Sequence, residues 1–459
     1  MNTLIVISVL GIISMLSDIL GFKKLIFPIV LVGLLLALSV TLCEWNQSQV
    51  YFNMLLLDNY AVAFGSIILG LLFFWMILST DQYKYEFNKS DQYALVLFST
   101  VGAYIMISFS SLIMLFVGIE IMSIPLYILA GSRKNDLSSN EASLKYFMMG
   151  AFTTGILLFG IALVYGATGS FEIFEIKNFI TNSSGEVPTL LYTGIIFLLI
   201  ALSFKVSAVP FHFWAPDVYQ GSPMMITAFM ASIVKVAGFG AFYRLFSYAF
   251  SDLANNWSII ISIIIVLTIL VGNILAAGQT NIKRMLAYSG ISQAGYMLMT
   301  LLILDQNSTN ALLFYAGSYA LATMAAFFVL YTISKESDIM TAEAFQGLGK
   351  RNPMLALVMS IAMLSLAGIP PAVGFFAKFY LFTTLLSQGY IALVIVAVIG
   401  SSISVYYYFK VIIAMYGKET EAGALKFQLN IMYQLILVIM VGLIILFGVY
   451  PSAVIEIIR

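Results

Sequence analysis

About fourteen apolar runs, most of them close to 20 residues long, follow one another along this chain of 459 residues. A helix needs about 20 apolar residues to cross a hydrocarbon core of about 30 Å, so each run predicts a membrane-spanning segment. Hydrophobic residues make up 61% of the chain and charged residues only 9%, a balance that gives a soluble domain too little charge for its surface. The runs lie near 3–20, 25–43, 61–79, 92–109, 111–130, 145–167, 189–219, 223–247, 257–277, 285–303, 310–333, 353–386, 389–416 and 431–450. The sequence therefore predicts an all-α integral membrane protein.

Two of these runs, 189–219 and 353–386, are too long for one straight span. Both contain proline near the middle, Pro210 in the first and Pro370 with Pro371 in the second. Proline removes a backbone donor, and the freed backbone groups are tolerated in a membrane only where protein or cavity water satisfies them. We expect each run to be a single broken helix.

The two broken helices hold corresponding places in two blocks of the chain. Runs four to eight and runs nine to thirteen form blocks of similar length, and the fourth run of each block is the broken one. Secondary transporters place their ion sites at interrupted helices in corresponding positions of two halves. We expect three N-terminal helices in 1–91, a first repeat in 92–248, a second in 249–416, and a C-terminal helix in 417–459.

The placement of basic residues predicts the orientation in the membrane. Loops that follow odd-numbered runs hold most of the 21 Lys and Arg residues, whereas the opposite side has only Lys177, Arg244 and Arg459. Cytoplasmic loops carry the excess of Lys and Arg. Both termini are therefore expected on the non-cytoplasmic side.

Four charged residues lie deep inside the apolar runs, away from their ends: Glu120, Lys205, Lys235 and Lys378. A charge at the centre of a bilayer costs about 2.5–3.5 kcal/mol on insertion scales, so such residues are functional candidates by default. Three lysines and one glutamate, spread over four runs, suggest a path for protons.

Glu120 and Lys205 are expected to act together. Each alone would favour its neutral form in a low-dielectric setting, whereas a pair can stay ionised. A water or proton that reaches Lys205 would compete for this pairing, so the pair could gate protonation of the lysine. The alternative is a static buried ion pair that only fixes helix register.

Lys235 and Lys378 have no acidic neighbour in their own runs. Lys235 lies among Met, Ile, Val and Ala, which favours an exchangeable proton and a relay role. The alternative is a lysine that snorkels to an interface. Lys378 follows the broken segment SLAGIPPAVGFF, where unwound carbonyls and cavity water would assist exchange, although an incidental cation at a packing kink is the other interpretation.

Two further groups are candidates for the path. His212, the single histidine, lies in VPFHFWAPDVYQG just past the first break and could carry protons near neutral pH, or serve as a structural donor. Lys145 is spaced i, i+4 from Glu141, which is typical of a local helix pair. It could also be a side entrance to Glu120.

The rarity of metal-binding and disulfide-forming residues excludes several kinds of site. A single cysteine, Cys43, and a single histidine cannot form a disulfide framework, a self-ligated iron–sulfur cluster or a His/Cys zinc site. The net charge is zero, so there is no basic field for nucleic acid. Any redox chemistry that this chain serves must take place on another subunit.

Four segments carry a family resemblance: KYFMMGAFTTGILLFGIALVYGATGS (145–170), FKVSAVPFHFWAPDVYQGSP (204–223), KRMLAYSGISQAGYM (283–297) and SLAGIPPAVGFFAKFY (365–380). They resemble the proton-translocating antiporter-like subunits of respiratory complex I, and the likeness extends over nearly all runs from the fourth to the thirteenth. The continuation DVYQGSP, and a lysine at 378 where the M-type tends to have glutamate, resemble the N-type subunit of the bacterial NADH–quinone oxidoreductase.

The resemblance implies a fold and a set of roles. It implies fourteen helices with two inverted five-helix repeats, each containing a broken helix. It also implies that Glu120, Lys205, Lys235 and Lys378 form a polar axis for proton translocation. His212 would be one of the polar-axis groups, and Lys145 part of the input route.

The resemblance further implies a non-redox subunit of an H⁺-translocating NADH:quinone oxidoreductase in the bacterial inner membrane. Flavin and iron–sulfur clusters are expected on partner subunits and no cofactor in this chain. The expected partners are the other membrane-arm subunits, the hydrophilic redox arm that they contact, membrane lipid and the quinone that the complex uses. The alternative function is a subunit of a cation/proton antiporter, or of a related hydrogenase-type ion-pumping complex.

Overall fold

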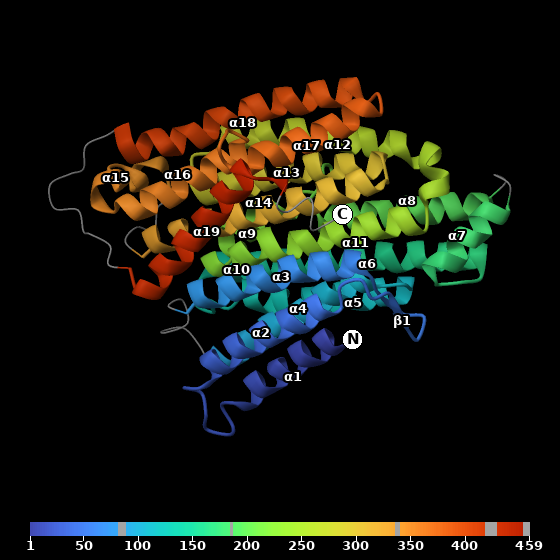
Figure 1. Ribbon diagram of the computed structural model, residues 1–459, viewed down its shortest axis with the longest axis horizontal. Helices are drawn as coiled ribbons and strands as arrows, with labels where there is room; N and C mark the ends of the chain where they lie inside the picture. The colour runs from blue at the N-terminus through green and yellow to red at the C-terminus, as the bar shows by residue number, and fades with distance from the viewer. Residues whose placement is uncertain (81–88, 184–186, 336–339, 418–428, 453–459) are drawn as a thin grey trace. The chain divides into compact units, whose positions relative to one another are not determined.

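The computed structural model describes residues 1–80, 89–183, 187–335, 340–417 and 429–452, most of which are helical (Figure 1). Each of the fourteen predicted runs contains helix. Within the described residues, nine helices are long and apolar enough to cross a membrane by themselves. The prediction of an all-α, multi-pass membrane protein is confirmed.

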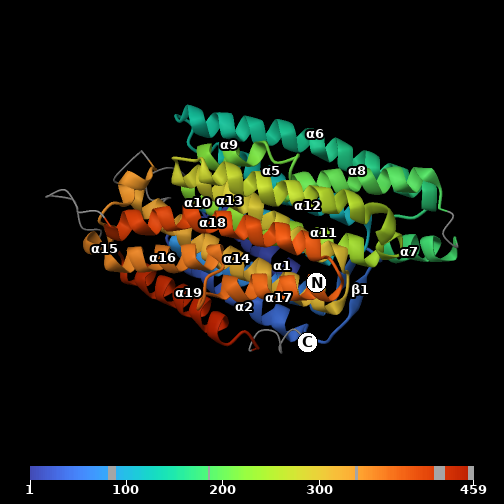
Figure 2. The ribbon, with the colours of Figure 1, turned by 90° about the horizontal axis from the view of Figure 1, so that it is seen from above.

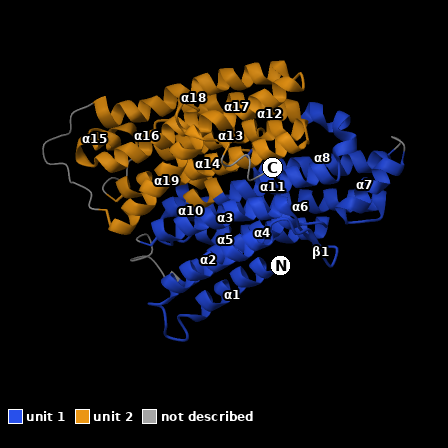
Figure 3. Cartoon of the chain, viewed as in Figure 1, with its two compact units in different colours: residues 1–207, 221–226, 233–260 blue, residues 208–220, 227–232, 261–459 orange. Residues whose placement is uncertain are grey.

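The chain divides into two compact units, coloured separately in Figure 3. Unit 1 comprises residues 1–207, 221–226 and 233–260, and unit 2 comprises residues 208–220, 227–232 and 261–459. These units follow spatial contacts, whereas the four-part division by residue number is a division by repeat and stays a prediction.

Unit 1 is organised around α4. Its helices are α1 (Asn2–Leu16), α2 (Ile26–Cys43), α3 (Asn59–Leu78), α4 (Lys89–Ser108), α5 (Leu112–Ala130), α6 (Leu137–Thr168), α7 (Ile173–Asn182), α8 (Thr189–Lys205) and α11 (Lys235–Tyr248). Helix α4 packs against α1, α3, α5 and α11, and α6 packs against both α5 and α8. Figure 2 shows α6 and α8 side by side. Glu120 on α5 and Lys205 on α8 therefore lie on two helices that both pack against α6.

Polar caps decide where several of these helices begin. Asp58 caps α3 by accepting from the Ala61 backbone N–H at 2.9 Å. Asp136 caps α6 by accepting from the Ser138 N–H at 2.9 Å, so this helix begins eight residues before the apolar run that predicted it. A carboxylate at an N-cap satisfies a backbone donor that has no partner within the helix.

Two elements of unit 1 were missed by counting apolar runs. A short antiparallel hairpin joins β1 (Gln49–Tyr51) to β2 (Leu55–Leu57), and strands of three residues are too short to show a pattern. Helix α7 buries Ile173, Ile176 and Ile180 on one face, and half of its ten residues are polar or charged. Such an amphipathic helix does not register as a membrane span.

Unit 2 is built around α14. Its helices are α13 (Ile282–Leu298), α14 (Gln306–Ile333), α15 (Leu348–Arg351), α16 (Pro353–Ala367), α17 (Val373–Ser387), α18 (Ile391–Gly417) and α19 (Ile431–Val449), with α9 (Trp214–Gly221) and most of α12 (Ala254–Ala277). Helix α14 packs against α16, α17 and α19, and α16 also packs against α18. Asn352 caps α16 and Pro353 occupies its first turn, a common start signal.

Both predicted broken helices are observed. Helix α8 ends at Lys205, and the chain resumes helical structure at Trp214 in α9. Helix α16 ends at Ala367, and α17 begins at Val373. Gly368 closes α16 with φ +82°, a left-handed conformation that glycine adopts without strain. A lysine lies at or near each break, as predicted.

The run 223–247 is interrupted in a way that its apolar pattern does not indicate. Helix α10 (Met224–Phe229) leads into a π-helical turn, Met230–Val234, and α11 begins at Lys235. Single π-helical turns inside helices are frequent at functional sites. The turn thus immediately precedes one of the candidate lysines.

Candidate functional site

A small cavity in unit 1 lies where α5, α6 and α8 meet. Its volume is about 20 Å³, and its walls include the side chains of Ser123, Tyr127, Tyr146, Thr154, Phe204 and Lys205. One water needs roughly 10–15 Å³ of such space and at least two polar partners. The cavity can therefore hold about one water, with hydroxyl and ammonium groups to bind it.

Lys205 is the last residue of α8 and is held by a hydroxyl group. Its Nζ donates to Ser123 Oγ at 2.7 Å, and Ser123 Oγ in turn donates to the Ile119 carbonyl. Because Ser123 donates its hydroxyl proton to the Ile119 carbonyl, a lone pair of Ser123 Oγ is left to accept from Lys205 Nζ. This arrangement suits an ammonium group that donates.

Glu120 is held by a different hydroxyl group. Thr154 Oγ1 on α6 donates to Glu120 Oε1 at 2.7 Å and also lies 3.1 Å from the Gly150 carbonyl. A hydroxyl has one proton and two lone pairs, so Thr154 can donate to a carboxylate or accept from a carboxylic acid. Thr154 can therefore keep a hydrogen bond to Glu120 whether the carboxyl group is ionised or protonated.

The expected direct ion pair between Glu120 and Lys205 is not formed. Within the described residues, no Glu120 oxygen lies within 4 Å of Lys205 Nζ. Each ion pair found at that distance joins two other groups. The physical reason is local competition, because Ser123 and Thr154 each offer a short hydrogen bond to one member. Both side chains are half-buried within this chain.

Unit 2 contains a second lysine site, at the break between α16 and α17. Lys378 Nζ donates to the Ala367 carbonyl at 2.9 Å, to the Leu366 carbonyl at 3.2 Å and to Ser401 Oγ at 2.9 Å. Its side chain is 5% exposed, and within the described residues no carboxylate pairs with it. The last carbonyls of a helix carry partial negative charge, which stabilises a cation there.

Two neighbours shape this second site closely. Nζ of Lys378 lies 5.1 Å from the centroid of the Tyr296 ring, within the range of a cation–π contact. A Cβ atom on Gly368 would lie 2.7 Å from Lys378 Cδ, so only glycine leaves room for the lysine stem. The broken helix therefore supplies both the carbonyls and the space.

A buried polar network next to Lys378 was not predicted from the sequence. Gln293 Nε2 donates to Leu366 O at 2.9 Å, and Tyr315 OH donates to Gln293 Oε1 at 2.5 Å. Tyr408 OH lies 3.4 Å from Gln293 Nε2 and 2.6 Å from Ser289 Oγ. These groups are uncharged and lie in apolar runs, so only their helical spacing on α13, Ser289 and Gln293 at i, i+4, could have indicated a shared face.

The remaining candidates lie at separate places. Lys235 is 3% exposed at the start of α11, in unit 1. His212 is 5% exposed in the first break, in unit 2, and its Nδ1 has no hydrogen-bond partner within the described residues. Lys145 pairs with Glu141 at 2.7 Å on the surface of α6, which confirms the predicted i, i+4 pair. It lies nine residues, or about 13 Å of helix, from Thr154.

Among the described residues, no group of three or more His, Cys, Asp or Glu side chains is placed to hold a metal ion. The chemistry that the two sites offer is therefore that of lysine, carboxylate and hydroxyl groups. These can bind, orient and release protons.

Residues 110–404 match the family described as NADH:quinone oxidoreductase/Mrp antiporter, TM. A protein of Cytophaga hutchinsonii named NADH-quinone oxidoreductase subunit N is 51% identical over 459 residues, covering 100% of this chain and 99% of that protein. The chain belongs to the family of NADH-quinone oxidoreductase subunit N. The family resemblance seen in the four sequence segments is confirmed.

Solved structures agree with this family assignment. A chain of respiratory complex I from Thermus thermophilus is 32% identical, with a TM-score of 0.83, and the match covers 99% of this chain and 98% of that one. A chain of the Mrp complex from Dietzia sp. has a TM-score of 0.89 at 20% identity, covering 99% and 95%, and shows a shared fold only. The antiporter-like fold is thus common to both kinds of complex.

The hydroxyl that holds Glu120 can be tested by substitution. We expect Thr154→Val to slow proton pumping severalfold without loss of assembly, because a hydrogen bond to a charged group contributes about 1.5–3 kcal/mol. The measurement is NADH-driven acidification of reconstituted vesicles, read with an internal pH-sensitive dye. Thr153→Val is the matched control, since Thr153 lines the same cavity but bonds only the Met149 carbonyl of its own helix. Equal pumping by the two variants would contradict the role of Thr154.

Proposed function

We propose that the chain is a proton-translocating membrane-arm subunit of an NADH–quinone oxidoreductase. Electrons pass from NADH to quinone on other subunits, and the energy released drives protons through this one. The observation that carries the proposal is the Lys205 site, where Lys205, Ser123 and Thr154 line a cavity large enough for about one water and Thr154 also donates to the Glu120 carboxylate. Membership of the family of NADH-quinone oxidoreductase subunit N supports the assignment of the redox reaction to partner subunits.

In this proposal each candidate residue has one role. Lys205 takes up and releases the proton, and Glu120 tunes it from the adjacent helix. Lys235 relays the proton with help from His212. Lys378 binds and releases the proton at the corresponding position of the second repeat. Lys145 marks a side entrance on the surface of α6.

Ser123 is a positioning residue in the same proposal. Its hydroxyl fixes Lys205 Nζ three residues from Glu120 along α5. The lysine therefore stays on the same helix face as the carboxylate without closing into a direct pair. A water in the cavity would contact Lys205 and Thr154, and Thr154 in turn is hydrogen-bonded to Glu120.

The chain itself would take no part in electron transfer. Flavin and iron–sulfur clusters would lie on partner subunits of the hydrophilic arm, which this chain reaches through other membrane-arm subunits. Its surroundings would be membrane lipid of the bacterial inner membrane, with both termini on the non-cytoplasmic side and no nucleic acid partner. The repeats would follow residues 92–248 and 249–416.

Copurification from membranes tests this function against a cation/proton antiporter. We expect the chain, carrying an affinity tag, to bring down large hydrophilic subunits with flavin absorbance and NADH-oxidising activity. Small membrane proteins alone, with sodium/proton exchange that needs no NADH, would instead support the antiporter. Either outcome can be read from one preparation.

A further inference from the structure

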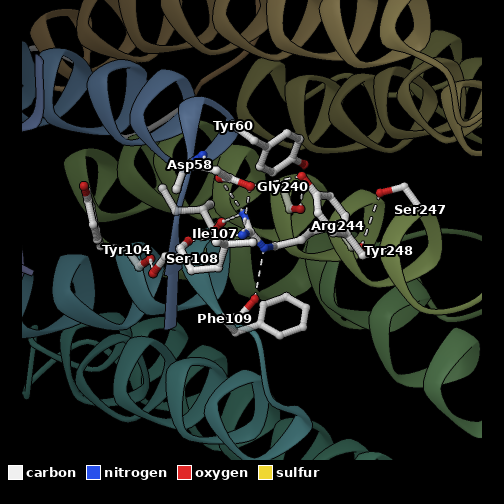
Figure 4. Close-up of polar contacts among 12 residues, drawn as sticks. Asp58, Tyr60, Tyr104, Ile107, Ser108, Phe109, Gly240, Arg244, Ser247 and Tyr248 are labelled. Atoms are coloured by element: carbon white, nitrogen blue, oxygen red, sulfur yellow. Dashed lines mark hydrogen bonds and ion pairs between the residues drawn. The ribbon is translucent and has the colours of Figure 1, made fainter. Parts of the chain in front are cut away.

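Unit 1 contains a buried arginine near the end of the apolar run 223–247. Arg244 lies in the C-terminal half of α11, and its side chain is 0% exposed. Figure 4 shows its guanidinium group enclosed between Asp58, Ile107 and Phe109. A buried charge of this kind needs a full set of partners.

Every N–H group of Arg244 is used. Nε donates to the Phe109 carbonyl at 3.0 Å, and Nη1 donates to the Ile107 carbonyl at 2.8 Å. Nη2 donates to the Leu56 carbonyl at 3.1 Å. The two remaining donors form a fork on Asp58, at 3.1 Å to Oδ1 and 3.2 Å to Oδ2. Five donors thus reach β2, the C-terminal end of α4 and the N-cap of α3.

Asp58 and two tyrosines complete the cluster. Tyr248 OH donates to Asp58 Oδ2 at 3.0 Å, while Asp58 Oδ1 also caps α3. The rings of Tyr60 and Tyr248 lie 5.5 and 5.2 Å from the guanidinium carbon of Arg244. The charge is therefore held in one orientation by hydrogen bonds and by cation–π contacts.

The same cluster fixes α11 along its axis. Tyr60 OH donates to the Gly240 carbonyl in the middle of α11 at 2.7 Å. A Cβ on Gly240 would lie 2.9 Å from Ile107 Cγ2, so α11 approaches α4 as closely as glycine allows. A shift of α11 by even a fraction of a turn would break these contacts together.

Helix α11 also carries Lys235 and packs against the end of α8. Lys235 lies nine residues before Arg244, about 13 Å along the helix. Between them, a Cβ on Gly238 would lie 3.3 Å from Val206 Cγ1 and 3.8 Å from Lys205 Cγ. The helix that Arg244 anchors at one end is thus in contact with the Lys205 segment near its other end.

We propose that Arg244, with Asp58, is a positioning residue that sets the place of Lys235 relative to the Lys205 segment by fixing the axial position of α11. The inference rests on the proposed proton path. Arginine is needed because a lysine ammonium has three donors and no planar fork, and cannot satisfy three carbonyls and a carboxylate at once.

The test is Arg244→Lys in the whole complex, reconstituted into vesicles with NADH and quinone. We expect assembled complex that pumps severalfold fewer protons per NADH, with a changed pH profile of pumping. The matched control is Arg284→Lys, which makes the same change in an Arg–Asp pair that is 30% and 36% exposed. Solvent screens such a partly exposed pair more than a buried one, so pumping by this variant should equal that of the wild type.

A purely structural role for Arg244 gives a different result. Assembly would fall, but the complex that does assemble would show the wild-type proton ratio and pH profile, and this overturns the proposal. If Arg244→Lys fails to assemble, Tyr248→Phe decides, because it removes only one hydrogen bond to Asp58. We expect a smaller loss of protons per NADH in that variant, and a wild-type ratio and profile would overturn the proposal.

One further variant separates this inference from the proposed function. If Lys235→Met pumps normally, the proton path itself is wrong. If Lys235→Met loses pumping while assembled Arg244→Lys pumps as the wild type does, only the positioning role fails.

Discussion

Replacement of Lys205 by methionine is expected to abolish most proton pumping while leaving the complex assembled. Methionine has a similar length and no proton to exchange, and it fills the end of α8 without a new polar group. The Ser123 hydroxyl would lose its ammonium partner but keep its bond to the Ile119 carbonyl, so the local fold is preserved. Acidification of vesicles given NADH and quinone, normalised to the amount of assembled complex, measures the effect.

Lys24→Met is the control for this experiment, because Lys24 is an exposed residue in the turn before α2. Its pumping should match that of the wild type. Wild-type pumping by Lys205→Met as well would remove Lys205 from the path and with it the role proposed for Glu120.

The second large effect is expected at Lys378. Lys378→Met removes the cation that oxygens of Leu366, Ala367 and Ser401 share. The Leu366 carbonyl keeps its bond from Gln293 Nε2, but the Ala367 carbonyl keeps only a long bond of 3.4 Å from Ser401 Oγ. An unsatisfied buried polar group costs about 1–3 kcal/mol, so a moderate loss of stability is expected beside a severalfold loss of pumping.

Lys378→Arg distinguishes the charge from the proton at this site. Arginine keeps the positive charge but does not release a proton in proteins, so pumping should stay low. Thermal unfolding of the purified complex gives the stability, and vesicle acidification gives the pumping. Recovery of pumping in Lys378→Arg would mean that the site needs only a fixed cation.

The sequence predicted the main architecture because hydrophobicity and proline act locally. The length of apolar runs determines the spans, and Pro210, Pro370 and Pro371 lie in the gaps between successive helices. The placement of Lys205 and Lys378 at the breaks followed from the same evidence. Helix α7 and the β1–β2 hairpin were not predicted, because neither has an apolar run of membrane length.

The local partners of the charged residues could not be predicted in the same way. Hydroxyl groups such as those of Ser123 and Thr154 are common in membrane helices, and only the packing of α5, α6 and α8 decides which of them meet a charge. Glu120 and Lys205 make no direct contact for this reason, and their joint role stays a prediction. The burial of Arg244 was not predicted either, because the backbone carbonyls that enclose it come from other segments of the chain.

The central claim is that Lys205 carries a proton rather than a fixed charge. The most direct measurement is the number of protons pumped per NADH by Lys205→Arg in reconstituted vesicles. The account predicts a ratio as low as that of Lys205→Met, because arginine keeps its proton. A ratio equal to that of the wild type would show that a permanent charge beside Ser123 and Glu120 is sufficient, and would contradict the account.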